Sequence, residues 1–300
     1  MAEIETIQLE ADGMRAAFAP AANMVLHSLT IGDRELLDAR DGLAAYLESG
    51  STMGVPLLHP WANRLGGLRY NAAGTEVVLE PDSGLFKCDG GGLPIHGALP
   101  ALLRWALVDA DAAKLMARLD WSPGHRAFRL FPFPHRLTYD ARLGSRRITI
   151  TITLEPSGDV AVPVSFGFHP YLRLSEGGRA DARMSLPVRR ALVLDASMIP
   201  TGETAPCEPG PRPLRDTGWD DGFTDLVDPA RFLLRDGESE ISVTFLRGYR
   251  FAQVFAPRDS GFVCFEPMTA PANALVTGGR DLPLVEPGGR YEAAFEIAVA

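Results

Sequence analysis

The stretch LTYDARLGSRRITITITL, residues 137–154, carries the clearest structural signal in this 300-residue sequence. Apolar and polar residues alternate on both sides of Gly144-Ser145. Because successive side chains of a β-strand point to opposite faces, an alternation with period two predicts two half-buried strands. Gly and Ser are common turn residues, so the two strands are expected to form an antiparallel hairpin that turns at Gly144-Ser145.

The same alternation recurs along most of the chain. It is found at residues 24–37, 68–79, 105–121, 241–245, 249–255, 262–266 and 291–299. Many short strands separated by turn residues are typical of an antiparallel sandwich, so the sequence predicts an all-β fold. Residues 175–183 and the Pro-rich residues 201–213 are interpreted as loops. Neither loop is interpreted as a linker, so residues 1–300 are predicted to form a single domain.

Composition and charge exclude several classes of protein. The net charge of −9 argues against nucleic-acid binding and against binding to an anionic membrane, both of which need clustered Lys and Arg. The sequence has neither a basic, apolar leader nor an apolar run of about 20 residues. Three widely spaced cysteines favour reduced thiols and a cytoplasmic location. No glycine-rich nucleotide loop or paired metal-ligand spacing is present, so neither a cofactor nor a metal is expected.

Four short stretches place a polar side chain at a strand end, next to Gly or Pro. They are HPWANR (59–64), LPIHG (93–97), VSFGFHPY (164–171) and CFEPM (264–268). Proline cannot donate to a sheet ladder, so Pro170 places His169 at the rim of a sheet. Glu266 shares a strand face with Phe262 and Cys264. A carboxylate on such an apolar face is either paired with a cation or functional, and desolvation raises its pKa towards that of a general base.

These four stretches, in this order, resemble the motifs of the aldose 1-epimerase (galactose mutarotase) family. The resemblance extends from about residue 55 to residue 275 and implies one large antiparallel β-sandwich, the galactose mutarotase-like supersandwich. It implies that Glu266 is the catalytic base and that His169 is the general acid. Because His169 must be protonated to donate, a neighbouring carboxylate or an electronegative pocket is expected. The implied partner is a small-molecule monosaccharide, bound by a monomer or a homodimer.

The resemblance also implies which residues bind the sugar: His96, Asn63, Arg64 and Asp220. Asp221 is the alternative to Asp220 if the loop is shifted by one residue. Gly97, which has no side chain, is expected to let the sugar approach the backbone. Trp219 and Trp61 are candidates for stacking on the sugar ring, although such aromatics more often belong to the core. Arg64 could instead form a salt bridge at a strand end, Asp220 could be a turn residue, and His59 is expected in the core.

The function that follows is interconversion of the α and β anomers of a free aldohexose by acid/base ring opening and closure. A mutarotase for a sugar phosphate or another modified sugar is the nearest alternative. A non-catalytic carbohydrate-binding protein and a glycoside hydrolase using Asp220 with Glu266 are more distant ones. A neutral sugar is favoured because Arg64 is the only basic residue within the motifs. Three further arginines, Arg69, Arg173 and Arg179, are close to the motifs in sequence.

Overall fold

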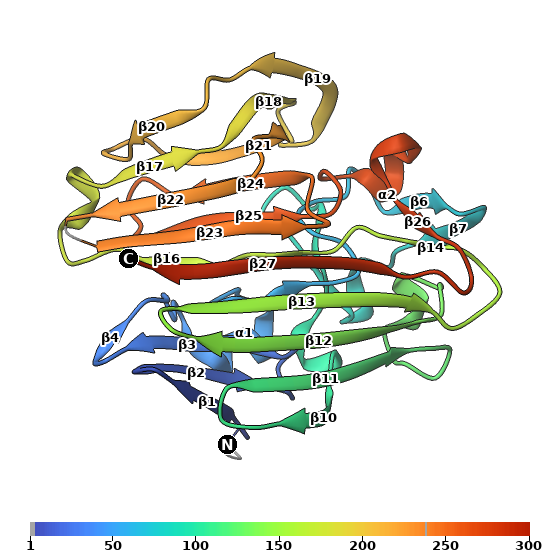
Figure 1. Ribbon diagram of the computed structural model, residues 1–300. Coiled ribbons are helices and arrows are strands. Elements are labelled where there is room, and N and C mark those ends of the chain that lie inside the picture. Colours follow the sequence, from blue (N-terminus) through green and yellow to red (C-terminus); the bar gives the residue numbers. More distant parts are fainter. Residues whose placement is uncertain (1–3, 238) are drawn as a thin grey trace.

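Two large antiparallel sheets form most of the molecule (Figure 1). This computed structural model describes residues 4–300 except residue 238. The nine-stranded sheet has the order β10-β11-β12-β13-β27-β23-β22-β17-β20, and β27 runs through its middle. The eight-stranded sheet has the order β19-β18-β21-β24-β25-β15-β5, and its eighth strand, β16, pairs with β25. The prediction of an all-β antiparallel sandwich is confirmed.

The strands of the nine-stranded sheet are β10 (Ala106–Ala110), β11 (Lys114–Trp121), β12 (His135–Gly144), β13 (Arg147–Pro156), β17 (Arg183–Leu186), β20 (Gly210–Pro213), β22 (Ala230–Asp236), β23 (Ser239–Arg247) and β27 (Tyr291–Val299). Those of the eight-stranded sheet are β5 (Leu57–Leu58), β15 (Gly167–Phe168), β16 (Tyr171–Arg173), β18 (Val188–Leu194), β19 (Pro200–Pro206), β21 (Trp219–Leu226), β24 (Phe251–Ala256) and β25 (Phe262–Met268).

Smaller elements surround the two sheets. One sheet contains β1 (Ile7–Ala11), β2 (Met14–Ala19), β3 (Val25–Ile31) and β4 (Arg34–Glu35). Three strand pairs are β6 (Arg69–Ala72) with β7 (Thr75–Val78), β8 (Phe86–Cys88) with β9 (Pro94–Ala98), and β14 (Val162–Pro163) with β26 (Leu284–Val285). The helices are α1 (Gly42–Ser49), α2 (Ala274–Thr277) and the short 3₁₀ turns η1 (Pro81–Ser83), η2 (Pro100–Leu102), η3 (Phe128–Leu130), η4 (Gly178–Ala180) and η5 (Gly279–Asp281). No helix in the described residues is long and apolar enough to cross a membrane.

The hairpin of residues 137–154 forms as β12 and β13, with alternating buried and accessible side chains. Its turn lies one residue later than predicted, on Ser145-Arg146, because Gly144 pairs with Arg147. Arg146 has φ +57°, a left-handed conformation that Gly adopts more easily. The turn position is therefore set by pairing of the flanking apolar residues and not by the local preference of Gly144.

Aromatic side chains from the two large sheets meet in a shared core. Phe232 of β22 lies 5.4 Å from Phe265 of β25 between ring centroids, and Phe168 of β15 lies 4.8 Å from Phe295 of β27. These contacts use the strand faces turned away from Glu266. The inner face of β25 is thus held by the core, and the outer face remains available for the polar residues of a site.

The interpretation of residues 201–213 as a loop is wrong. Most of this stretch forms β19 and β20, which lie at the top of Figure 1. Each is the last strand of its sheet, where one row of backbone N–H groups has no ladder partner. Proline lacks an N–H group and is therefore tolerated on such edge strands, which is why the Pro-rich composition was misleading.

Two buried histidines pack against each other far from Glu266 in the sequence. The Nε2 atoms of His59 and His135 are 3.2 Å apart, and His135 Nδ1 lies 2.7 Å from the carbonyl oxygen of Phe133. Burial lowers the pKa of His135 to about 4 and lowers that of His59 well below its usual value. His59 is a core residue, as expected.

We predict that the free energy of unfolding falls as the pH decreases from about 6.5 towards 4.5. The unfolded histidine binds a proton near pH 6.5, whereas the folded one does not, so acid favours the unfolded state. For His135 the loss is about 2–3 kcal/mol at pH 4.5. Urea unfolding at several pH values measures it. The variant His135→Asn should show a weaker pH dependence, and an unchanged dependence would contradict the role of His135.

Candidate active site

The pairing of β25 places Glu266 directly opposite His169. Gly167 of β15 pairs with Met268, and Tyr171 of β16 pairs with Cys264. Stepping two residues inward from either pair brings position 169 opposite position 266. His169 therefore interrupts what would otherwise be one strand, and its side chain meets that of Glu266 across the gap.

Two prolines keep the ladder open at this point. Pro170 follows His169 and Pro267 follows Glu266, and neither can donate a backbone hydrogen bond. The N–H group of His169 instead donates to the carbonyl oxygen of Pro56 at 3.2 Å. The sequence-based expectation that Pro170 places His169 at a strand end is confirmed.

His169 and Glu266 form a buried pair. The distance between His169 Nε2 and Glu266 Oε1 is 3.2 Å, and the two residues are 4% and 1% exposed. Burial lowers the pKa of His169 to about 3 and raises the pKa of Glu266 well above its usual value. Both groups are thus driven towards their neutral forms, in which the pair carries one dissociable proton, on Glu266. The expected carboxylate neighbour of His169 is Glu266 itself.

A cavity of about 190 Å³ opens over this pair. Residues from many parts of the chain line it: Arg40, Thr52, Asn63, Arg64, Lys87, Ile95, His96, His169, Tyr171, Asp220, Phe255 and Glu266. Oε2 of Glu266 and Nδ1 of His169 are buried, and neither has a hydrogen-bond partner in the described residues. A carboxylate oxygen in this setting can accept a hydrogen bond from a bound molecule.

Arg64 is fixed in the wall of the cavity by its neighbours. Its Nε donates to Asp89 Oδ2 at 2.7 Å, and its Nη2 lies 3.7 Å from Asp220 Oδ2. Asn63 has φ +54°, and its Oδ1 accepts hydrogen bonds from the backbone N–H and Nη1 of Arg64. The predicted substrate-binding residue Arg64 thus lines the cavity and also forms the salt bridge that was the alternative. Asn63 lines the cavity too and orients Arg64.

Asp220, and not Asp221, faces the cavity. Asp220 Oδ1 accepts a hydrogen bond of 2.6 Å from Gln253 Nε2, and Gln253 pairs with Glu266 across β24 and β25. Because successive residues of β21 point to opposite faces, Asp221 is turned away from this side. Asp220 is thus a strand residue whose carboxylate is hydrogen-bonded to Gln253. The alternative interpretation of Asp220 as a turn residue is wrong.

His96 lies beside His169 in the cavity wall, at 5.5 Å between ring centroids. Its backbone has φ +64°, and its N–H donates to the carbonyl oxygen of Asn63 at 3.0 Å. The structure gives a packing reason for Gly97. A Cβ atom on Gly97 would lie 2.2 Å from the carbonyl oxygen of His59, so the close approach of these two backbones requires a glycine.

Neither candidate tryptophan lines the cavity. Trp61 is fully buried in the core, and half-buried Trp219 packs against the core. Trp219 precedes Asp220 on β21 and therefore points to the other face. One aromatic side chain that does line the cavity is Phe255, 5.6 Å from His169 between ring centroids. Phe255 shares a strand face with Phe251 and Gln253. The amide of Gln253 on this otherwise aromatic face was the sequence signal that could have marked the strand as part of a site.

Sequence reasoning missed several residues of the cavity wall that lie away from Arg64 and Asp220. Arg40, Thr52 and Lys87 line it but belong to stretches without a motif. Tyr171 belongs to the His-Pro-Tyr motif, and its ring stacks on His169 at 4.5 Å and 7°. Conversely, the lining contains none of the three arginines considered from the sequence, Arg69, Arg173 and Arg179. The lining does contain Arg40 and Lys87 in addition to Arg64, so the premise that the site has few cations is wrong.

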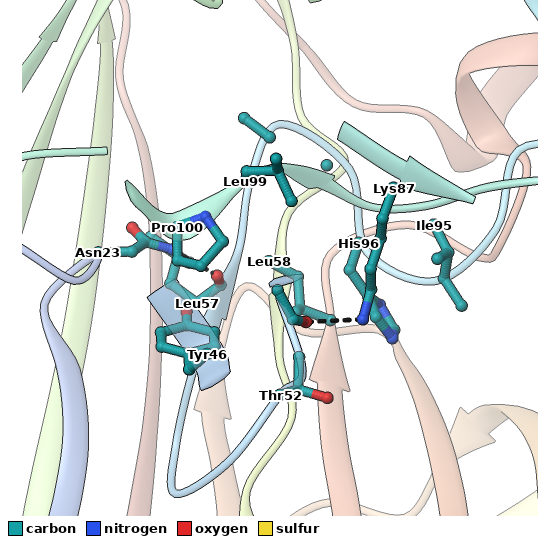
Figure 2. A pocket seen from close by; sticks show the side chains of 13 residues that line it. Asn23, Tyr46, Thr52, Leu57, Leu58, Lys87, Ile95, His96, Leu99 and Pro100 are labelled. Atoms are coloured by element: carbon teal, nitrogen blue, oxygen red, sulfur yellow. Dashed lines mark hydrogen bonds between the residues drawn. The ribbon is translucent and has the colours of Figure 1, made fainter. Parts of the chain in front are cut away.

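A second, much smaller cavity adjoins the first. Thr52, Lys87, Ile95 and His96 line both cavities, and Figure 2 shows them in the wall of the smaller one. Lys87 Nζ donates to the carbonyl oxygen of Gly50 at 2.6 Å. In the described residues, no group of three or more His, Cys, Asp or Glu side chains is arranged to hold a metal ion.

Known structures share this fold over nearly the whole chain. A galactose mutarotase-like protein from Clostridium acetobutylicum has a TM-score of 0.82 and 16% identity, with 100% of this chain and 96% of that chain covered. The Slr1438 protein from Synechocystis sp. PCC 6803 has a TM-score of 0.80 and 24% identity, with 99% and 96% covered. These structures establish the galactose mutarotase-like fold predicted from the motifs.

Sequence comparison gives the family. The uncharacterised protein YihR from Escherichia coli (strain K12) is 25% identical over 258 residues, which cover 81% of this chain and 80% of that protein. The sequence model of aldose 1-epimerase matches residues 6–298. With the match spanning the whole cavity and both members of the His169–Glu266 pair, the chain belongs to the aldose 1-epimerase family.

Proposed function

We propose that the protein interconverts the α and β anomers of a free aldose by opening and closing the sugar ring. The observation that carries this proposal is the buried pair of His169 and Glu266, which face each other in a cavity of about 190 Å³. Mutarotation requires one acid and one base held on either side of the anomeric centre. A protein that only binds sugar needs no such pair.

In the proposed reaction Glu266 accepts the proton of the O1 hydroxyl while His169 donates a proton to the ring oxygen O5. The C1–O5 bond breaks, its electron pair remains on O5, and C1 and O1 form a carbonyl. Rotation about C1–C2 presents the other face of the carbonyl. Ring closure then returns the proton from O5 to His169 and the proton from Glu266 to O1, which gives the other anomer.

The protonation states fit this cycle. Ring opening leaves Glu266 protonated and His169 neutral, and burial favours that state for both groups. Before ring opening, the reactive form has a deprotonated Glu266 and a protonated His169. It carries the same number of protons as the neutral pair and forms from it when one proton moves from Glu266 to His169. Burial therefore makes Glu266 a stronger base and His169 a stronger acid for the opening step.

The remaining polar residues are proposed to hold the sugar hydroxyls. Arg64 offers donors and Asp220 offers an acceptor beside Glu266, Asn63 completes this side, and His96 lies beside His169. Positioning by these residues turns acid and base attack into steps within one complex. That the chain is a single domain, and that it is a monomer or a homodimer, remain predictions from the sequence.

We predict that Glu266→Gln lowers kcat by at least about 10²-fold while the protein stays folded, because the amide cannot accept the O1 proton. Polarimetry of freshly dissolved α-D-glucose or α-D-galactose measures the rate above the uncatalysed reaction. Asp221→Asn is the matched control, since this acid lies off the cavity, and it should stay within about twofold of the wild type. Wild-type rates in Glu266→Gln would rule out the assigned base.

The single dissociable proton of the pair predicts a flat pH profile near neutrality. Activity requires the His169–Glu266 pair to carry one proton, and the lowered pKa of His169 and the raised pKa of Glu266 widen the range in which it does so. We expect kcat/KM to vary by less than about threefold between pH 6 and pH 8. A steep loss centred near pH 6.5 in protein that remains folded would contradict this assignment.

We also predict that activity survives dialysis against a chelator, because the two proton transfers need no Lewis acid. Mutarotation rates before and after dialysis against EDTA provide the measurement. A loss of activity that is restored by Zn²⁺ or Mg²⁺ would overturn the mechanism.

A further inference from the structure

The two ends of the cavity differ in charge. At the Glu266 end, the positive charge of Arg64 lies against the carboxylates of Asp89 and Asp220. At the His169 end, Arg40 and Lys87 line the cavity together with Thr52 and Tyr171. Neither Arg40 nor Lys87 forms an ion pair with any residue described by the structure. One end is therefore internally compensated, and the other carries two positive charges.

Neutral groups hold both cations in place. Arg40 Nη1 lies 3.3 Å from the hydroxyl oxygen of Tyr171, and its guanidinium lies 5.4 Å from the centre of that ring. The Tyr171 hydroxyl also lies 2.6 Å from Thr52 Oγ1. Half-buried Lys87 donates to the carbonyl oxygen of Gly50 just after α1 (Figure 2). These contacts orient the cations without neutralising them. Against the effect of burial, the carboxylate of Asp41, the next residue in the chain, helps to raise the pKa of Arg40 but forms no ion pair with it.

The electrostatic effects follow the same division. Burial is the main reason why the pKa of His169 is lowered, and the charges of Arg40 and Lys87 lower it further. Burial also lowers the pKa of Lys87, and the charge of Arg40 adds to this effect. Glu266 instead is affected by Asp220 and Arg64. An anion placed between Arg40 and Lys87 would relieve their mutual repulsion and favour protonation of His169.

We propose that the aldose bound by this protein carries an anionic group on C6, held by Arg40 and Lys87 with the Thr52 hydroxyl. This inference rests on the proposed mutarotation for the orientation of the sugar. It replaces the sequence-based expectation of a neutral sugar, which rested on Arg64 as the only basic residue within the motifs and on the net charge of −9.

The connectivity of a pyranose selects C6. His169 serves O5, and O5 is bonded to C5, which carries C6. Glu266 serves O1 on C1, whose other carbon neighbour is C2. When both groups engage the sugar, C6 therefore lies on the side of His169 with Arg40 and Lys87, and the C2 and C3 hydroxyls lie on the side of Glu266 with Arg64 and Asp220.

A carboxylate and a phosphate monoester share the chemistry that this end of the cavity recognises. A guanidinium presents several donors to either oxyanion, and an ammonium adds a point charge. Hydrogen bonds to charged groups contribute about 1.5–3 kcal/mol each, so one such contact corresponds to a preference of about tenfold or more over the neutral sugar. The anion also offsets the charges that disfavour protonated His169, so kcat is expected to rise as well.

The experiment compares each neutral sugar with its C6 anions. Glucose, glucose 6-phosphate and glucuronate are one set, and galactose with its corresponding derivatives is the second. NMR exchange between the anomeric proton signals at equilibrium gives kcat/KM, and the shift in melting temperature measures binding without catalysis. We expect kcat/KM for at least one anionic sugar to exceed that of its neutral partner by about tenfold or more. The two anions distinguish a carboxylate from a phosphate.

Four variants test the cations. Lys87→Gln and Arg40→Gln should each lower the ratio of anionic to neutral kcat/KM by about tenfold, whereas Lys87→Arg should largely retain it. Arg118→Gln removes an exposed charge of β11 on the other sheet and should leave the ratio unchanged. Equal or faster turnover of the neutral sugars, with a ratio insensitive to Lys87 and Arg40, overturns the inference and leaves the mutarotase proposal intact. If no sugar is turned over, but anionic sugars raise the melting temperature and Lys87→Gln abolishes this, the mutarotase proposal fails and the anion site stands.

Discussion

The register of β25 against the interrupted strand β15–β16 is the constraint on which the site depends. Gly167 with Met268 and Tyr171 with Cys264 fix this register on both sides of the gap, so His169 and Glu266 must face each other. Pro170 and Pro267 remove the donors that would close the ladder between them. The inner faces of the same strands are held by the aromatic core, for example by Phe265 against Phe232, so the pair is built on a rigid scaffold.

Burial of this pair links the fold to the proposed chemistry. A lone carboxylate or imidazolium at this depth would be costly, but a neutral pair avoids that cost. The same desolvation strengthens Glu266 as a base and His169 as an acid. Tyr171 stacks on His169 and reaches Thr52 and Arg40 through its hydroxyl, so it connects the acid to the cationic end of the cavity.

The cavity wall is assembled from segments that are distant in sequence. Arg40 and Thr52 flank α1, Lys87 and His96 come from β8 and β9, and Asp220 comes from β21. None of these segments pairs with β25. The distribution of charge in the cavity therefore depends on how these segments pack. The net charge of the chain is −9, so it predicts the wrong sign of charge for the end of the cavity that holds Arg40 and Lys87.

The sequence alone was enough to predict the all-β sandwich, because period-two alternation is a local consequence of strand geometry, as in residues 137–154. It also located His169 and Glu266 as polar residues at proline-marked positions of apolar strands. It could not determine that residues 201–213 are strands, because an edge position is defined only by the neighbours in a sheet. Nor could it assign Trp219, Arg40 and Lys87 correctly. Which backbone approaches Gly97, which face Trp219 takes and which cations enter the cavity are decided by long-range packing, and only the tertiary structure brings those atoms together.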